Sequence, residues 1–251
     1  MKFSALILAG TRPGGDPLAG TEGKPHKALI ELEGTALLER VSDALREAGA
    51  DRIAVSCDHP DVVALARSLE LKVLPTGQGP SESTAIAFAE LGAPLLVTTA
   101  DHGLLKPQWV RHMVANTPPS ADLSIMLAER RDIEAAMPGS KRTYLRLADG
   151  AWSGCNLFYL QHEGAGRAIE SWKAVEADRK RPWRIVRRLG LSTLARYAFG
   201  RLSMAQAIEM LGLRMGVRAS LVKAPDGLAA VDVDNPEDLN EIRALLRERR
   251  A

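Results

Sequence analysis

The chain has few cysteines, few aromatic residues and no long apolar run, and each shortage excludes a class of protein. Its two cysteines, Cys57 and Cys155, stand far apart without a C-x-x-C pair, which excludes a cysteine metal cluster and suits a reducing compartment. Aromatic residues make up only 4% of the sequence, which argues against a stacking platform for nucleic acid. No apolar run approaches the roughly 18 residues of a membrane span, and no signal peptide is visible. We therefore expect a cytoplasmic protein without a nucleic-acid partner.

Charge of neither sign dominates, because 33 Lys and Arg against 31 Asp and Glu give a net charge of +2. Apolar residues make up 46% of the 251 residues, which is enough for the core of one domain. No linker divides the sequence, so we expect a single domain over residues 1–251.

The spacing of apolar residues predicts alternating strands and helices. Residues 3–9 (FSALILA) form a continuous apolar run, typical of a strand buried on both faces. Further strands are expected at 52–56, 71–74, 94–98, 123–128, 143–147, 154–160 and 220–223. Helices are expected at 35–48, 60–69, 81–91, 107–115, 165–177 and 237–249, with a basic helical stretch at 179–213 interrupted by glycines. This order predicts an α/β fold, a three-layer sandwich with a mostly parallel, twisted, Rossmann-like sheet and a helical insertion at about 165–215.

The segment after the first strand, GTRPGGDPLAGTEGKPHK, is rich in glycine and basic residues and has little to bury. At the carboxyl end of a parallel strand, such a loop lies where open α/β sheets bind ligands. Free backbone N–H groups, together with Arg12, Lys24 and Lys27, favour a phosphate ligand. The spacing matches neither G-x-G-x-x-G nor G-x-x-x-x-G-K-[ST], and a solvated surface loop is an equal alternative.

Three carboxylates follow apolar stretches later in the chain. Asp101 comes just past an expected strand and suits Mg²⁺, which prefers hard oxygen ligands. Asp232 and Asp234 are two residues apart, so on an extended strand both would point the same way. The alternative in both places is a helix N-cap, and at the second Asn235 would cap a helix that begins at Pro236.

The sequence also resembles a known family. The stretches LILAGTR and KALIELEGTALLERV resemble the pattern LAxGxGxRM…K…L…G.PLL.R of nucleotidyltransferases with the GT-A-type nucleotide-binding fold. Thr11 replaces a second glycine, and GGDPLAG is inserted before the lysine. The family includes molybdenum cofactor guanylyl- and cytidylyltransferases and cytidylyltransferases for sugar or polyol phosphates. Its later segment VDTPEDL resembles VDNPEDL here, so Asp234 matches the aspartate that joins the metal and Asp232 is an extra group.

The resemblance implies roles for the matching residues. Arg12 and Lys27 would be the catalytic cations on the triphosphate, Asp101 and Asp234 would hold Mg²⁺, and Gly154 and Asn156 would contact the acceptor. The implied nucleotide-binding residues are Leu8, Ala9, Gly10, Thr11, Arg12, Lys27, Gly79, Ser81, Ser83 and Asp101.

The implied reaction is Mg²⁺-dependent transfer of NMP from an NTP, with CTP or GTP favoured, to a phosphorylated acceptor with release of pyrophosphate. The acceptor stays open between a molybdopterin, a sugar or polyol phosphate and a lipid-like phosphate. The alternatives are a GT-A glycosyltransferase and a sugar-nucleotide-binding protein without catalysis. A glycosyltransferase usually carries D-x-D after its central strand, where this chain has Thr99, Ala100 and Asp101.

The segment from Arg179 to Arg201 is strongly basic and lies outside the family's shared core. A helical insertion with a solvated basic face is the favoured interpretation, because charge runs are usually solvated. The alternative is a basic rim that binds an anionic acceptor or makes a peripheral contact with an anionic membrane surface.

Overall fold

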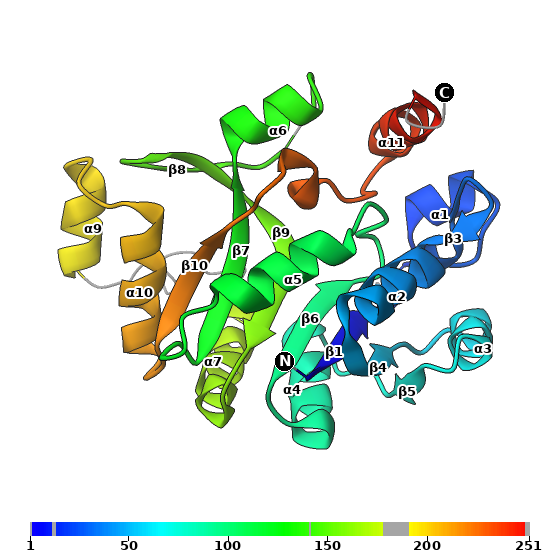
Figure 1. Ribbon diagram of the computed structural model, residues 1–251, viewed down its shortest axis with the longest axis horizontal. Helices are drawn as coiled ribbons and strands as arrows, with labels where there is room; N and C mark the ends of the chain where they lie inside the picture. The colour runs from blue at the N-terminus through cyan, green and yellow to red at the C-terminus, as the bar shows by residue number, and fades with distance from the viewer. Residues whose placement is uncertain (1, 12–13, 141, 178–190, 249–251) are drawn as a thin grey trace.

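The computed structural model describes residues 2–11, 14–140, 142–177 and 191–248 (Figure 1). The strands are β1 (Phe3–Leu8), β2 (Glu31–Leu32), β3 (Thr35–Ala36), β4 (Ala50–Ser56), β5 (Lys72–Leu74), β6 (Leu95–Thr99), β7 (Leu123–Glu129), β8 (Leu145–Leu147), β9 (Gly150–Leu160) and β10 (Ala219–Lys223). The α-helices are α1 (Pro17–Thr21), α2 (Leu37–Ala48), α3 (Pro60–Ser68), α4 (Pro80–Leu91), α5 (Pro107–Asn116), α6 (Arg130–Ala136), α7 (Gly166–Ala177), α9 (Leu191–Ala198), α10 (Met204–Arg214) and α11 (Pro236–Glu248). Short 3₁₀ helices are η1 (Lys27–Leu29), η2 (Glu163–Ala165) and η3 (Gly227–Ala230).

An eight-stranded sheet runs through the molecule in the order β10–β7–β9–β6–β1–β4–β5, with β8 beside β9. The pairs β1–β4, β1–β6, β4–β5 and β7–β10 are parallel, whereas β9 is antiparallel to β6, β7 and β8. The sheet is therefore mostly parallel, as the sequence predicts.

Helices cover both faces of this sheet, which confirms the three-layer sandwich. Alternation along β1 directs Ala5 and Ile7 into one core cluster and Leu6 into another, because successive side chains of a strand point to opposite faces. The first cluster includes Val41 of α2, and the second includes Ile169 of α7. Figure 1 shows α2 and α5 on one side of the sheet and α4 and α7 on the other.

Two expectations about the helical segments were wrong. The glycine-rich loop contains α1, because the Asp16 carboxylate accepts a hydrogen bond from the Leu18 backbone N–H at 3.0 Å and Leu18 and Ala19 are buried. Gly212 lies inside α10 and does not interrupt it. A Cβ at Gly212 would lie 2.6 Å from the Ala219 Cβ, so glycine allows α10 to approach β10 closely.

The predicted basic stretch is only partly within the described residues, because residues 178–190 lie outside them. The remainder forms α9 and α10, separated at Gly200, which has a φ of +61°. Within the part of the chain that the structure describes, no helix combines the length and apolar character that crossing a membrane requires.

Candidate functional site

Lys27 lies at the centre of the candidate site. Its ammonium group donates hydrogen bonds to Asp101 Oδ2 at 2.7 Å and to Asp234 Oδ1 at 3.0 Å. The residue begins η1, where the preceding His26 ring accepts a hydrogen bond from the Ala28 N–H. Only 8% of Lys27 is exposed, so three residues far apart in the sequence meet at a largely buried cation.

Parallel strand ends bring Asp101 to this position. The register pairs Leu8 of β1 with Thr99 of β6, and the Ala100 N–H donates to the Leu8 carbonyl at 3.0 Å. Asp101 therefore follows β6 at the edge where the glycine-rich loop leaves β1. Since the N-cap of α5 is Lys106, the alternative of a helix cap does not apply to Asp101.

The second acidic segment differs from the expectation. Residues 232–234 are not a strand, and the two carboxylates have different partners. Asp232 is buried and accepts a hydrogen bond from the Asn156 amide at 2.7 Å, whereas the half-exposed Asp234 contacts Lys27. Asn235 caps α11 as predicted, because its Oδ1 accepts a hydrogen bond from the Asp238 N–H at 2.9 Å.

Arg142 is a member of this cluster that sequence reasoning missed. Its guanidinium donates to the Asp232 carbonyl at 2.9 Å and lies 3.7 Å from Asp234 Oδ2 and 3.5 Å from Asp238 Oδ1. The side chain is only 7% exposed. It comes from the segment between α6 and β8, which carries no motif, so no signal in the sequence pointed to it.

Burial and charge act against each other in this cluster. Burial alone would raise the pKa of Asp101, but neighbouring Lys27 holds that pKa below its usual value. Burial would likewise lower the pKa of Lys27, yet Asp101 and Asp234 raise it. Burial, together with the carboxylates of Asp101 and Asp234, holds the pKa of Asp232 well above its usual value. The cluster thus contains a strong ion pair and one carboxyl group that resists ionisation.

The loop after β1 supplies backbone groups to the candidate site as well as the side chain of Lys27. Thr11 donates from its N–H at 3.1 Å and from its hydroxyl at 2.7 Å to Asp58 Oδ1, which fixes the loop against the end of β4. Leu8, Ala9 and Gly10 lead directly into this contact. Arg12 lies outside the described residues. Lys24 is paired with Glu31 away from the aspartates, so of the two lysines considered only Lys27 joins them.

The residues implied for base recognition lie at the start of α4. Gly79 is the N-cap of this helix, and Ser81 and Ser83 are both buried. The Ser83 hydroxyl accepts a hydrogen bond from the Gly77 N–H at 2.9 Å, which closes the turn before the helix. The three residues lie together at one helix end, but Ser83 already has a structural role.

Gly154 and Asn156 lie on a bulged part of β9. Opposite β7, Leu127 pairs with Gly154 and Ile125 pairs with Phe158, so β9 has three intervening residues where β7 has one. Asn156 takes a φ of +47°, which is uncommon for a residue other than glycine. The bulge directs its amide to Asp232 and links the implied acceptor residues to the acidic cluster.

His102 does not have the environment of a general base. It is fully buried and stacks on Trp109 with ring centroids 6.1 Å apart. Burial lowers the pKa of His102 to about 4, so the ring is neutral at pH 7. His102 is therefore a buried, neutral neighbour of Asp101.

The carboxylates of Asp101 and Asp234 offer the hard oxygen atoms that Mg²⁺ prefers as ligands. Asp232 Oδ1 is buried and has no hydrogen-bond partner among the described residues. The same residues contain no group of three or more His, Cys, Asp or Glu side chains arranged around one metal position. Mg²⁺ typically uses one or two carboxylates plus phosphate oxygens, so two aspartates would suffice.

Comparisons with known proteins give a consistent result. Residues 5–193 match the family described as MobA-like NTP transferase domain. A hypothetical transferase from Thermus thermophilus is 31% identical, with a TM-score of 0.82 over 95% of this chain and 100% of that one. A CMP:2-keto-3-deoxy-manno-octonic acid synthetase complexed with CTP is 17% identical, with a TM-score of 0.59 over 99% and 100%. A 2-C-methyl-D-erythritol 4-phosphate cytidylyltransferase, also from Thermus thermophilus, is 16% identical, with a TM-score of 0.52 over 98% and 100%. The likeness to the last two structures shows that this chain shares their fold.

Proposed function

The chain belongs to the MobA-like NTP transferase domain family and is a nucleotidyltransferase, and from this premise we propose that it transfers NMP from CTP or GTP to a phosphate monoester. An acceptor phosphate oxygen forms a bond to the α-phosphorus, the bond to the β-phosphate oxygen breaks, and pyrophosphate leaves with the electron pair. We place this reaction in the cytoplasm, where the two free, buried thiols of Cys57 and Cys155 would stay reduced.

The observation that carries the proposal is the contact of Lys27 with Asp101 and Asp234 at the end of the glycine-rich loop. Nucleotidyl transfer requires the protein to position the substrates and to neutralise phosphate charge, more than to form covalent bonds with them. Lys27 is held as a cation by two carboxylates and directly follows His26, whose ring accepts a hydrogen bond from the Ala28 N–H. In the proposed complex Lys27 would neutralise the α-phosphate and departing pyrophosphate together with Arg12.

Mg²⁺ belongs to the proposal as the cofactor held by Asp101 and Asp234, and it would neutralise phosphate charge. The Arg142 guanidinium lies 3.7 Å from Asp234 Oδ2 and 3.5 Å from Asp238 Oδ1, and these contacts keep the loop before α11 in place. Gly79, Ser81 and Ser83 would contact the base, and Gly154 and Asn156 the acceptor.

The alternatives agree less well with these residues. A GT-A glycosyltransferase would usually place a D-x-D motif where Thr99, Ala100 and Asp101 stand. A sugar-nucleotide-binding protein without catalysis would not need the buried pair of Lys27 and Asp101.

A nucleotide panel tests the proposal. Thermal unfolding is measured with CTP, GTP, UTP and ATP plus Mg²⁺, and pyrophosphate release is then measured with candidate phosphates. A nucleotide at 100 times its Kd stabilises the fold by about 2.7 kcal/mol, which raises Tm by roughly 5–10 °C for a chain of this size. Lys27→Ala should remove the pyrophosphate release and Lys24→Ala should keep it. Failure of all four nucleotides to shift Tm would contradict the proposal.

A peripheral contact with anionic membranes is a second candidate, favoured by exposed aromatics beside arginines. Phe199 is 77% exposed and Tyr197 is 55% exposed, next to Arg196 and Arg201. Each cation near an anionic surface contributes about 1 kcal/mol, and aromatic side chains favour the interface. Flotation with anionic and neutral vesicles tests this contact. Binding only to anionic vesicles, lost in a Tyr197→Ser/Phe199→Ser variant or when Arg184, Arg187 and Arg188 become Glu, supports it.

A further inference from the structure

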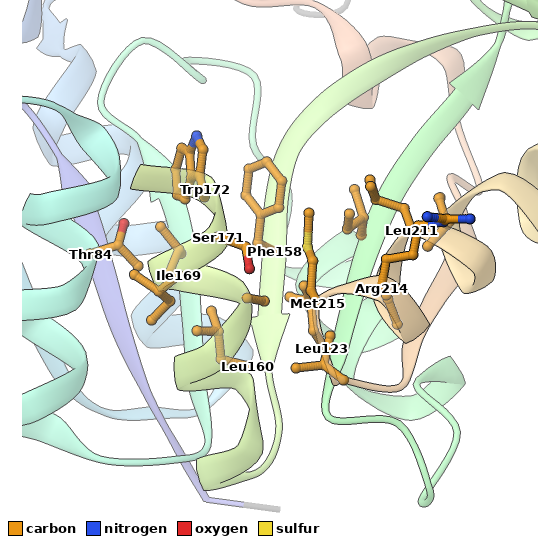
Figure 2. Close-up of a pocket in the computed structure, with 17 residues that line it drawn as sticks. Thr84, Leu123, Phe158, Leu160, Ile169, Ser171, Trp172, Leu211, Arg214 and Met215 are labelled. Atoms are coloured by element: carbon orange, nitrogen blue, oxygen red, sulfur yellow. The ribbon is translucent and has the colours of Figure 1, made fainter. Parts of the chain in front are cut away.

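A large apolar cavity lies between α7 and α10, with the sheet behind it (Figure 2). Its volume is about 720 Å³, within the range of small-molecule pockets. Ile169 and Trp172 line it from α7, Leu211 from α10, and Phe158 and Leu160 from β9. Polar groups are few, so the cavity suits an apolar ligand of considerable length.

The end of the cavity nearest the candidate site is formed by two aromatic rings. Phe158 and Trp172 stack with centroids 6.0 Å apart, and Figure 2 shows them together at one end, with Leu123 and Leu160 at the other. Thr84, the residue after Ser83 of the implied nucleotide site, also lines the cavity. One end of the cavity therefore lies beside the first turns of α4, next to the implied nucleotide-binding residues, and the cavity extends from there toward Leu123 and Leu160.

The strand β9 connects this cavity to the implied acceptor residues. Gly154 and Phe158 share one face of the sheet, because their partners Leu127 and Ile125 are two residues apart on β7. Two residues of a strand span roughly 7 Å. A Cβ at Gly154 would have no described atom within 4 Å, so the space directly beside Gly154 is open.

We propose that the cavity between α7 and α10 binds the apolar chain of the acceptor, which is then a lipid-like phosphate monoester with its phosphate near Gly154 and Asn156. This inference rests on the proposed transfer reaction and names the acceptor class that the reaction uses. The stacked rings guide the chain, and the aliphatic side chains beyond them remove it from water.

The test measures binding of ethyl, hexyl and decyl phosphate below their critical micelle concentrations by calorimetry. Burying a methylene group improves affinity about fourfold, so affinity should rise steeply with chain length until the cavity is full. Decanol should bind far more weakly than decyl phosphate. Equal affinities for ethyl and decyl phosphate, or for decanol and decyl phosphate, would overturn the assignment.

Two substitutions that fill the cavity make the test specific. Ser171 and Met215 are partly exposed and line the cavity from opposite sides, so Ser171→Phe and Met215→Trp narrow it without crowding the buried core. Each should abolish the dependence on chain length while leaving the Tm shift with nucleotide unchanged. Ala205→Phe, on the exposed face of α10, is the matched control and should bind decyl phosphate like the parent protein.

Pyrophosphate release separates this inference from the proposed function. If alkyl phosphates bind with the expected chain-length dependence and no NTP is consumed, the transfer reaction is wrong and the cavity is an apolar ligand site of another kind. If NTP is consumed with short sugar phosphates and decyl phosphate neither binds nor reacts, the acceptor assignment is wrong and the transfer reaction stands.

Discussion

Replacing Lys27 by methionine should destabilise the protein strongly, because it leaves a buried carboxylate without its partner. The side chains of Lys27 and Asp101 are only 10% and 16% exposed, and their charged atoms are 2.7 Å apart. Removing one partner of a buried pair typically costs about 3–5 kcal/mol, which lowers Tm by roughly 6–20 °C for a chain of this size. The contact with Asp234 adds little, since that side chain is 49% exposed and solvent screens it.

Urea unfolding of Lys27→Met beside Lys24→Met measures this effect. Lys24 pairs with the half-exposed Glu31, so its replacement should cost no more than about 1 kcal/mol. The pKa of Asp101 is lowered in the folded protein, so its pairing stabilises the fold above the ordinary carboxyl pKa and is lost as the pH falls through the folded value. The difference in the free energy of unfolding between the parent protein and Lys27→Met should therefore become smaller in acid. Adding Asp101→Asn should recover most of the loss at pH 7. Equal losses for the two lysine variants would refute the reasoning.

Three further changes probe the same cluster. Asp101→Ala should abolish Mg²⁺-dependent NTP turnover and keep a cooperative unfolding transition; near-parental turnover in limiting Mg²⁺ would exclude Asp101 from the mechanism. Asp232→Asn should raise stability at pH 7 by about 0.5–2 kcal/mol, the gain commonly seen when a functional-site residue is replaced, because burial and the neighbouring carboxylates raise the pKa of Asp232 and so make this titratable group unfavourable in the fold above the ordinary carboxyl pKa; calorimetry that finds a lower Tm would contradict this. Burial lowers the pKa of His102 to about 4, so the unfolded chain takes up this proton before the folded protein does. The free energy of unfolding should therefore fall between about pH 6.5 and pH 4, by up to about 1.4 kcal/mol per pH unit. His102→Gln should flatten this dependence of the free energy of unfolding on pH, as measured by urea titrations.

The fold was predictable because its signals are local. Continuous apolar runs identified strands such as β1, and apolar residues at helical spacing identified α2, which ends at Gly49 with a φ of +100°. The short helix α1 also had a local signal, since Asp16 before Pro17 is a favoured N-cap and N1 pair. Its inclusion in a loop was an error of interpretation.

The site was predictable only where strand ends determine it. Lys27 and Asp101 follow neighbouring parallel strands, so their approach follows from the order of the sheet. The different partners of Asp232 and Asp234 depend on the bulge at Asn156, which has no pattern in the sequence. Arg142 is brought in by packing between segments about 90 residues apart, which spacing alone does not reveal.

The arrangement around Asp232 is unfavourable for the stability of the fold. The carboxylate is buried beside two others, one of its oxygens has no hydrogen-bond partner among the described residues, and Asn156 takes an uncommon backbone conformation to bond the other oxygen. An asparagine at this position would carry no charge and would be cheaper to bury. Costs of this kind are concentrated where function requires them. The same carboxylate interacts electrostatically with Lys27 and Asp101, so it supports the proposal that a cation and phosphate groups supply the missing partners when substrate binds.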